Sequence, residues 1–327
     1  MARPKVFVSR QIFPDSIEKI ISETDVDVWS SELPPARDVM LKKVSGVSGI
    51  LCLLTDKIDA DLMDAAGPQL KVISQIAVGF ENIDISEATR RGIAVGYTPD
   101  VLTQTTADAT FALMMAAARR ISEAERAVRA GKWKTWHPLH YLGQDIYGSK
   151  LGIMGLGRIG VEVGKRAKGF DMEVVYNDIA RREDIESLHS FAFVDQDTLL
   201  SESDFVTLHT TLNEDTYHLI GEQEFIKMKP NAILVNAARG PVVDPKALYN
   251  ALKNKQIAAA ALDVTEPEPI DADDPLLTLD NCIIVPHIAS ASVDTRREMS
   301  RIAAQNLLNG LRGEKLDACV NPEVYQD

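Results

Sequence analysis

Three side chains capable of anion binding and proton transfer each follow a short apolar run in the second half of the chain. The runs and the side chains that follow them are 232–236 with Arg239, 259–263 with Glu268, and 283–285 with His287. Such runs are typical of buried parallel strands, and in doubly wound sheets ligands bind at the carboxyl ends of the strands. We therefore expect the three side chains to project into one crevice.

Arg239, Glu268 and His287 have the chemistry that the reduction of a 2-keto acid requires. A guanidinium binds a carboxylate through two parallel hydrogen bonds and polarises a neighbouring carbonyl. An imidazole can donate a proton to the developing alkoxide, and a carboxylate beside it stabilises its protonated form and fixes its orientation. We predict all three as catalytic residues, with Arg239 binding the substrate, His287 as general acid/base and Glu268 as the partner of the histidine. Each has an ordinary structural alternative on its own, but their succession beside a cofactor motif favours catalysis.

A glycine motif of the form G-x-G-x-x-G stands between an apolar run, 151–154, and a helix-like segment, 161–168. Its six residues are Gly155, Leu156, Gly157, Arg158, Ile159 and Gly160. In this context the motif is typical of a dinucleotide-binding turn. The first glycine permits the tight turn, the second lets the backbone approach a pyrophosphate, and the third lets the helix pack against the strand. The N-terminus of the helix then favours the negative charge of the phosphates, so we predict all six residues as cofactor-binding.

Asp178 ends the next apolar run, 173–177, eighteen residues after the last glycine of the motif. A carboxylate at this spacing accepts hydrogen bonds from the adenosine ribose and repels a 2′-phosphate, which favours NAD(H). Arg181 and Arg182 lie close by and could bind the 2′-phosphate, so NADP(H) remains the alternative cofactor. A further alternative is that Asp178 caps the following helix. His209 and Asp263 also end predicted strands, and we expect them to line the cofactor cleft, Asp263 next to the nicotinamide carboxamide.

The elements that would position these residues form two series. Short β-branched runs alternate with amphipathic segments, such as 14–23 and 85–91, as in α/β chains with parallel sheets. The first series of strands is 5–9, 25–29, 49–54, 71–76 and 93–96. After an aromatic-rich interruption, 131–148, the second series is 150–154, 173–177, 205–209, 232–236, 259–263 and 283–285. Six parallel strands with helices between them predict a doubly wound nucleotide-binding domain.

Two domains are expected, because 327 residues exceed what a single core usually supports. An apolar, alanine-rich segment, 101–120, predicts a long buried helix that joins the two series. A second helix, 294–312, is expected to return to the first domain. We therefore predict a Rossmann dinucleotide-binding domain at 101–292 and a smaller, discontinuous substrate-binding domain at 1–100 plus 293–327.

Composition excludes several classes of partner. The 35 Lys and Arg residues against 48 Asp and Glu give a net charge of −13, which repels nucleic acids and anionic lipids. Cys52, Cys282 and Cys319 are widely spaced, so neither a metal site nor a disulfide framework is indicated. The apolar stretch near the N-terminus is too short for a signal peptide, and the longest apolar run, 111–118, is too short for a membrane span. A cytoplasmic protein is expected.

Several motifs in chain order resemble those of the D-isomer-specific 2-hydroxyacid dehydrogenases. They are VGFENID at 78–84, TAD at 106–108, GLGRIG at 155–160, NAARGPVVD at 236–244, LDV at 262–264 and PHIAS at 286–290. The likeness covers essentially the whole chain. The segment 131–140, with Trp133 and Trp136, resembles the glyoxylate/hydroxypyruvate reductase branch.

The resemblance implies two doubly wound parallel-sheet domains, the smaller one flavodoxin-like, and the same roles for the arginine, glutamate and histidine. It implies substrate binding by Leu54, by backbone N–H groups near Val78 and Gly79, and by Trp136 reaching across from a partner subunit of a homodimer. It also implies cofactor contacts at Thr106, Ala237 and Ala289. For Trp133 and Trp136, ordinary packing at an interface is an equally compatible interpretation.

The resemblance predicts reduction of a small 2-keto acid, glyoxylate or hydroxypyruvate, to the D-2-hydroxy acid. A dehydrogenase of phosphoglycerate or of another D-2-hydroxy acid is the first alternative. A dinucleotide-sensing scaffold, similar to the corepressors of the family, is the second.

Overall fold

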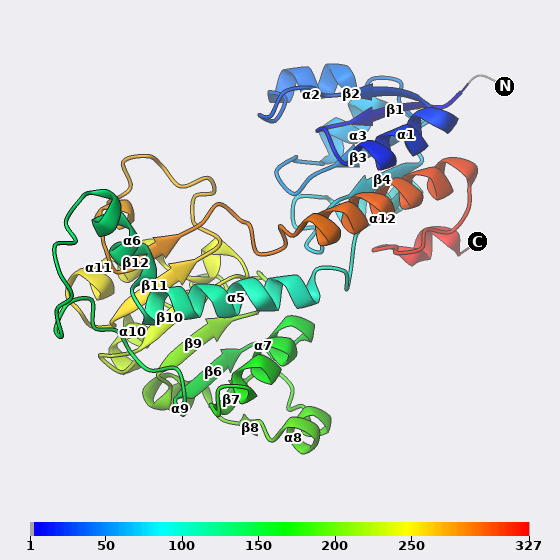
Figure 1. The fold of residues 1–327 in the computed structure, drawn as a ribbon. Coiled ribbons are helices and arrows are strands. Elements are labelled where there is room, and N and C mark those ends of the chain that lie inside the picture. Colours follow the sequence, from blue (N-terminus) through cyan, green and yellow to red (C-terminus); the bar gives the residue numbers. More distant parts are fainter. Residues whose placement is uncertain (1–2, 327) are drawn as a thin grey trace. The chain divides into compact units, whose positions relative to one another are not determined.

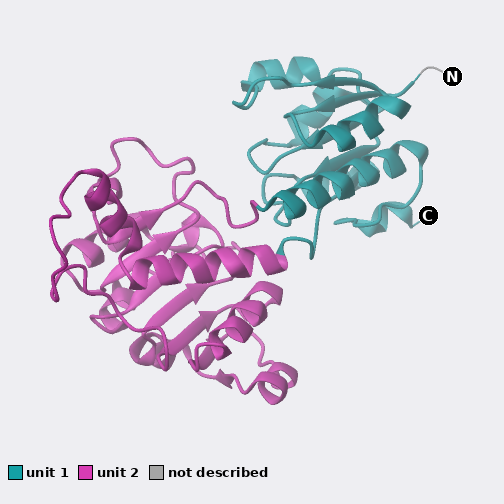
Figure 2. Ribbon diagram, in the orientation of Figure 1, with its two compact units in different colours: residues 1–102, 292–327 teal, residues 103–291 magenta. Residues whose placement is uncertain are grey.

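The computed structural model describes residues 3–326, which form two compact units (Figure 2). Unit 1 comprises the described residues up to Leu102 and from Ser292 onward, and unit 2 comprises Thr103–Ala291. The sequence placed these divisions after residue 100 and after residue 292. Within residues 3–326, no helix combines the length and the apolarity that crossing a bilayer requires.

Unit 1 is built on a five-stranded parallel sheet in the order β2-β1-β3-β4-β5 (Figure 1). Its strands are β1 (Lys5–Val8), β2 (Asp25–Val28), β3 (Gly49–Cys52), β4 (Val72–Gln75) and β5 (Ala94–Gly96). Its α-helices are α1 (Pro14–Glu23), α2 (Arg37–Lys43), α3 (Ala60–Ala66), α4 (Ile85–Arg90) and α12 (Val293–Arg312). This order is flavodoxin-like, with the direction of winding reversing between β1 and β3. The α12 helix packs on β3 and β4, so the end of the chain returns to the unit in which it began.

Unit 2 contains a seven-stranded parallel sheet in the order β12-β11-β10-β9-β6-β7-β8. Its strands are β6 (Lys150–Met154), β7 (Glu173–Asn177), β8 (Ala192–Phe193), β9 (Phe205–Leu208), β10 (Ile233–Asn236), β11 (Ala259–Leu262) and β12 (Cys282–Ile284). Its α-helices are α5 (Thr103–Ala118), α6 (Ile121–Arg129), α7 (Arg158–Lys168), α8 (Glu183–His189), α9 (Gln196–Glu202), α10 (Glu222–Lys227) and α11 (Pro245–Lys253). The winding reverses between β6 and β9, which is the Rossmann switch point. The predicted fold class is thus confirmed for both units.

Alternating side chains of the strands divide the core of unit 2 into two layers. Val206, Leu208 and Leu234 belong to one buried cluster, whereas Phe205 and Val235 belong to the other. Neighbouring residues of a strand point to opposite faces, so helices on both sides are needed to bury such continuous apolar strands. The same alternation separates two clusters in unit 1.

Two details differ from the sequence prediction. The sheet of unit 2 has seven strands and not six, because the sequence prediction omitted β8, a strand of two exposed residues within the short apolar run 191–194. The predicted helix 101–120 is α5, which ends at Ala118, and Arg120 then adopts a left-handed φ of 53° that separates it from α6. α5 is apolar around most of its circumference, as expected of a helix packed against β10, β11 and α7.

Candidate active site

The predicted catalytic residues follow three strands that are neighbours in the sheet of unit 2. The last residues of β10 and β11, Asn236 and Leu262, are paired in register, and Leu262 is paired with Ile284 of β12. The chain segments that carry Arg239, Glu268 and His287 therefore leave the sheet side by side at its carboxyl edge. This is the edge at which ligands bind in such sheets.

His287 and Glu268 are in direct contact. The Nδ1 atom of the imidazole lies 2.6 Å from Oε1 of the carboxylate, with the two side chains 28% and 35% exposed. Because an ionised carboxylate can only accept a hydrogen bond, Nδ1 is the donor in this contact. The backbone of His287 has a left-handed φ of 53°, a costly conformation that is found preferentially at functional sites.

The loop with His287 is held by Asp263, the residue that follows β11. The Asp263 side chain is buried, and its two carboxylate oxygens accept from the N–H groups of Ile288, at 2.7 Å, and Ala289, at 3.0 Å. The N–H of His287 donates to the Asp263 carbonyl at 2.9 Å. Three successive peptide groups are thus fixed by one aspartate. The sequence indicated only a contact of Asp263 with the cofactor, which stays a prediction, as does the cofactor contact of Ala289.

The turn with Arg239 is held by Asn236, the last residue of β10. The buried Asn236 amide donates to the Arg239 carbonyl at 2.8 Å and accepts from the N–H of Ala238 at 3.0 Å, so it closes the turn around Ala237. The Arg239 guanidinium donates to the carbonyl of Ala238 at 2.8 Å. Sequence reasoning did not assign this positioning role, although an amide that ends an otherwise apolar strand was a signal for it.

The glycine motif has the geometry of a phosphate-binding turn between β6 and α7. Gly155 has a φ of 89°, and a Cβ on Gly160 would lie 2.4 Å from the Gly155 carbonyl oxygen, so a side chain at either position would open the turn. A Cβ on Gly157 would meet nothing within 4 Å. Gly157 is the N-cap of the 11-residue α7, where no described side chain forms a cap. The turn is therefore tightly packed at Gly155 and Gly160 and open at Gly157, where a pyrophosphate would approach.

Asp178 lies next to this turn. Its carboxylate accepts from the N–H of Leu156 at 2.6 Å and from that of Ile179 at 2.7 Å. The two nearby arginines each form a two-pronged ion pair with a carboxylate of α8, Arg181 with Glu186 and Arg182 with Asp184. A 2′-phosphate at this position would be repelled by the negative charge of Asp178. It would also have to compete with Glu186 and Asp184 for the two arginines.

His209 follows β9 at the switch point of the sheet. Its backbone N–H donates to the Met154 carbonyl at 2.8 Å, and its Nε2 lies 2.9 Å from Thr207 Oγ1. Burial lowers the pKa of His209 to about 3, so the ring is neutral at physiological pH. Within the described residues, its buried Nδ1 has no hydrogen-bond partner, as expected of a group that binds a ligand.

Thr106, which the sequence also assigned to the cofactor, is buried in the first turns of α5.

Together, the open turn, the uncapped helix, Asp178 and the orphaned His209 nitrogen fit a dinucleotide. The remaining residues of the motif agree with this placement. Arg158 is exposed at the start of α7, Leu156 is buried, and Ile159 is half-buried against the core.

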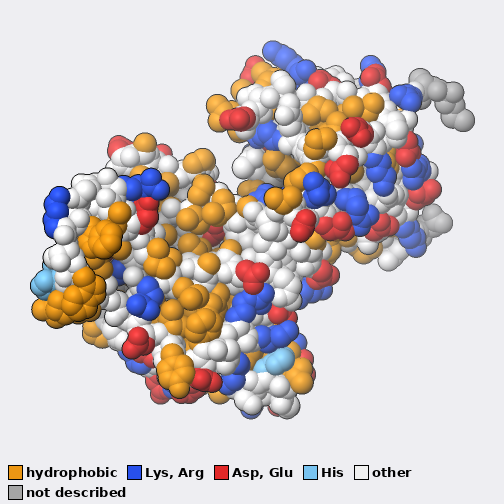
Figure 3. All heavy atoms as spheres, in the orientation of Figure 1, with side chains coloured by type: hydrophobic (Ala, Val, Ile, Leu, Met, Phe, Trp, Pro, Cys, Tyr) orange, Lys and Arg blue, Asp and Glu red, His pale blue; other side chains and the backbone are white. Residues whose placement is uncertain are grey.

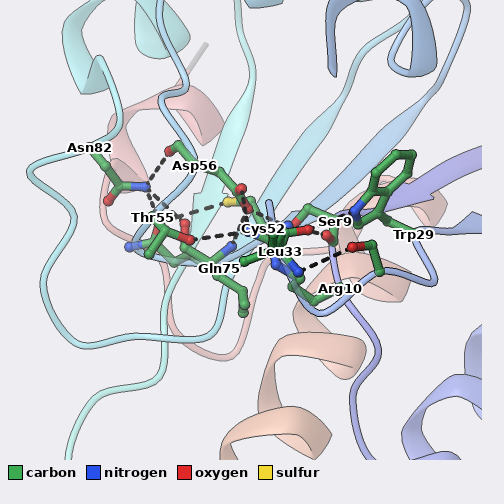
Figure 4. Close-up of polar contacts among 11 residues, drawn as sticks. Ser9, Arg10, Trp29, Leu33, Cys52, Thr55, Asp56, Gln75 and Asn82 are labelled. Atoms are coloured by element: carbon green, nitrogen blue, oxygen red, sulfur yellow. Dashed lines mark hydrogen bonds and ion pairs between the residues drawn. The ribbon is translucent and has the colours of Figure 1, made fainter. Parts of the chain in front are cut away.

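In unit 1, a polar network connects the segments after β3 and β4 (Figure 4). The Asn82 amide donates to Leu53 and Asp56 carbonyls at 3.2 and 2.8 Å and to Gln75 Oε1 at 2.7 Å. The Gln75 amide in turn donates to the Gly79 carbonyl at 2.5 Å. These bonds fix the backbone on either side of Leu54, Val78 and Gly79, which the sequence assigned to substrate binding. Sequence reasoning missed Gln75 and Asn82 as the residues that hold them.

Trp136 lies in the long loop after α6, where its side chain is 79% exposed. Large apolar side chains gather on this part of unit 2 (Figure 3). The exposed members of the loop are Trp133, Trp136, Leu139, Tyr141, Leu142 and Tyr147. An apolar surface of this extent is typical of an interface between proteins.

Comparison with known proteins decides the family. Residues 111–289 match the family model of the D-isomer specific 2-hydroxyacid dehydrogenase, NAD binding domain. The chain is 53% identical over 325 residues to a glyoxylate reductase from Korarchaeum cryptofilum, which covers 99% of this chain and 98% of that protein. This chain belongs to the D-isomer specific 2-hydroxyacid dehydrogenase family.

Solved structures of relatives agree with the fold of this dehydrogenase. The TT0316 protein from Thermus thermophilus is 40% identical with a TM-score of 0.92, covering 97% of this chain and 99% of that one. An NADPH-dependent glyoxylate/hydroxypyruvate reductase from Sinorhizobium meliloti, in complex with NADP and malonate, is 30% identical with a TM-score of 0.84 and 98% of each chain covered. The family confirms that this protein is an NAD(P)-dependent oxidoreductase.

Proposed function

We propose that this dehydrogenase reduces glyoxylate to glycolate, or hydroxypyruvate to its D-2-hydroxy acid, with NAD(P)H. The observation that supports it most is the 2.6 Å contact between His287 and Glu268 at the strand edge that also presents Arg239. The glyoxylate reductase from Korarchaeum cryptofilum, 53% identical over 99% of this chain, supports the choice of a small keto acid.

A dinucleotide held by the glycine turn, Asp178 and His209 would supply the hydride for the carbonyl carbon of the substrate. Arg239 binds the substrate carboxylate and the carbonyl oxygen, so that the carbonyl is polarised. Glu268 holds Nδ1 of His287, which directs Nε2 toward the substrate, and Nε2 donates its proton to the oxygen as negative charge develops there. The backbone near Val78 and Gly79, fixed by Gln75 and Asn82, is also proposed to take part in substrate binding.

The experiment that tests this function measures absorbance at 340 nm with purified protein, NADH or NADPH, and one keto acid at a time. Glyoxylate, hydroxypyruvate, pyruvate and phosphohydroxypyruvate form the panel. We expect the highest kcat/KM with glyoxylate or hydroxypyruvate. A clear preference for phosphohydroxypyruvate would contradict the proposal and favour a phosphoglycerate dehydrogenase. Tight NADH binding without turnover of any keto acid would indicate a binding protein.

For the cofactor we propose NAD(H) over NADP(H), with Asp178 as the discriminating residue. The Asp178→Ala variant is expected to lose about 10- to 100-fold in kcat/KM with NADH, because charge-assisted hydrogen bonds to the ribose are removed, while kcat/KM with NADPH rises. Glu183→Ala, which removes an exposed carboxylate of α8, is the control for net charge and should change neither value. A wild-type protein that uses NADPH as well as NADH would contradict this assignment.

We further propose a homodimer in which the exposed loop with Trp136 contacts the partner subunit. The apolar side chains of this loop support the proposal, because such a surface is costly in water. In light scattering, we expect twice the chain mass of 35.9 kDa for the wild type and a shift to monomer for Leu142→Asp. Leu188→Asp, at an exposed leucine of α8, is the control and should remain dimeric. A monomeric wild type would contradict the proposal.

A cytoplasmic location is part of the same proposal. Cys52, Cys282 and Cys319 form no disulfide. Burial raises the pKa of the Cys282 thiol to about 12 and raises that of Cys52 as well, so both stay protonated and unreactive. Free, protonated thiols are typical of proteins of a reducing compartment.

A further inference from the structure

We propose that His218 is a positioning residue for the reaction, which acts by holding the loop that carries Glu268. The inference rests on the function proposed above, in which Glu268 orients His287. The loop that carries Glu268 takes part in a second histidine–glutamate pair. His287 binds Glu268, and His218 binds Glu266, two residues earlier in the chain.

The contact between His218 and Glu266 is short and partly shielded from water. Nε2 of the imidazole donates to Oε2 of the carboxylate at 2.6 Å, with the side chains 31% and 27% exposed. The ring of Tyr217 stacks on that of His218 at a centroid distance of 4.0 Å, and its hydroxyl donates to Glu266 Oε1 at 3.3 Å. Both carboxylate oxygens of Glu266 are therefore bound from one side of the loop.

The backbone of His218 is itself anchored to the turn that carries Arg239. The His218 N–H donates to the Pro241 carbonyl at 2.7 Å, and the N–H of Ile220 donates to the Val242 carbonyl at 3.1 Å. His218 has a left-handed φ of 51°, so the segment is held in a conformation that the histidine alone would not favour. One residue thus contacts both the arginine turn, through its backbone, and the glutamate loop, through its ring.

The glutamate loop needs such support because of its composition. Pro267 and Pro269 have no N–H group, so this segment can donate few backbone hydrogen bonds. The Thr265 hydroxyl donates to the Pro267 carbonyl at 2.8 Å. A Cβ on Gly240 would lie 1.8 Å from the Thr265 carbonyl oxygen, so the arginine turn and the start of the glutamate loop touch through their backbones. Further along the loop, the hydrogen bond from His218 fixes Glu266, the residue immediately before Pro267 and Glu268.

The structure therefore assigns His218 an effect on kcat that passes through Glu268. A displacement of the catalytic carboxylate by about 1 Å is enough to lower the rate substantially. Substrate and cofactor need not bind more weakly, because the residues proposed to bind them are held by other contacts. This separates a positioning role from a general contribution to folding.

The test compares two substitutions of His218 in the full-length enzyme. Asparagine in His218→Asn tolerates the positive φ, but its shorter side chain does not reach Glu266. Glutamine in His218→Gln has its amide nitrogen the same number of bonds from Cβ as Nε2 of the histidine. We expect His218→Asn to lower kcat about 10- to 100-fold with KM for the keto acid and Kd for NADH changed less than about twofold. His218→Gln should restore most of the loss. Tyr217→Phe, which removes only the 3.3 Å bond, is the matched control.

A second measurement asks whether the effect passes through Glu268. In a Glu268→Gln background, adding His218→Asn should cause no further loss of kcat, because the Glu268 carboxylate, which His218 positions through Glu266, is already absent. An equal further loss in that background would overturn the inference, as would full activity of His218→Asn in the otherwise wild-type enzyme. If Glu268→Gln were itself fully active, the role proposed for Glu268 would be wrong, and the inference with it. If only the His218 variants kept full activity, the inference alone would be wrong.

Discussion

Replacing Arg239 with alanine is expected to lower kcat/KM for the keto acid about 1000-fold, while Kd for NADH stays within about twofold. The guanidinium is proposed to make two charge-assisted hydrogen bonds to the substrate carboxylate and to polarise the carbonyl. Losing bonds of this kind costs about 4 kcal/mol in the transition state. NADH binding should persist because the glycine turn and Asp178 belong to other loops. Stopped-flow turnover and quenching of protein fluorescence by NADH measure the two quantities.

Arg239→Lys serves as the second variant in this test. It keeps the positive charge but cannot form the planar, two-pronged contact, so we expect only partial recovery of kcat/KM. Melting temperatures of both variants report any effect on folding, which should be small because Asn236 holds the turn through backbone atoms. Full activity of Arg239→Ala would mean that another cation binds the substrate and that the assigned mechanism is wrong.

Replacing His287 with asparagine is expected to lower kcat about 1000-fold, within the range usual for the loss of a general acid. Asparagine is chosen because it tolerates the left-handed φ of 53° at this position, so the loop held by Asp263 should keep its shape. Glu268→Gln should cost less, since the imidazole remains and only its orientation and charge partner are weakened. Single-turnover kinetics in the direction of keto-acid reduction distinguish the two.

The same variant tests the direction of the pH dependence. Reduction consumes a proton, so the wild-type rate should fall as rising pH depletes the protonated form of the donor. The residual rate of His287→Asn should lack this fall. His209 cannot supply it, because burial lowers its pKa to about 3 and the ring is already neutral. A fall that survives in His287→Asn would assign the proton donor to another group.

Periodicity and glycine spacing predicted most of the fold. Eleven of the twelve described strands were predicted, β12 with a displacement of one residue. Most of them are short apolar runs, because strands buried on both faces must be apolar throughout, whereas β2 alternates Asp and Val. The two-residue β8 was not predicted, although it lies in the apolar run 191–194, because that run is short and both residues of the strand are exposed. The end of α5 was placed two residues too late, because Arg119 and Arg120 have a helix propensity close to that of the alanines before them, and only the left-handed backbone of Arg120 separates α5 from α6.

For the candidate site, residue chemistry predicted the histidine–glutamate contact but not what supports it. Glu268 and His287 are nineteen residues apart, and their pairing followed from the expectation that neighbouring strands end at one edge. The backbone-capping roles of Asn236 and Asp263 depend on which N–H groups their side chains reach. Such contacts depend on the conformation of each loop, which spacing alone does not determine. The same holds for Gln75 and Asn82.

Because Asp263 holds the loop with His287 through backbone N–H groups, it limits the side chains of that loop little. Asp263 accepts a hydrogen bond from the peptide N–H of position 288, so it makes no demand on the side chain there, and Ile288, the residue after His287, is 46% exposed. Any residue with an N–H, that is, any except proline, can occupy this position without moving His287. Position 289 lacks this freedom, because Ala289 is buried. Natural drift or a saturation library at position 288 is therefore expected to introduce new side chains next to His287 while Asp263 keeps the loop with His287 in place.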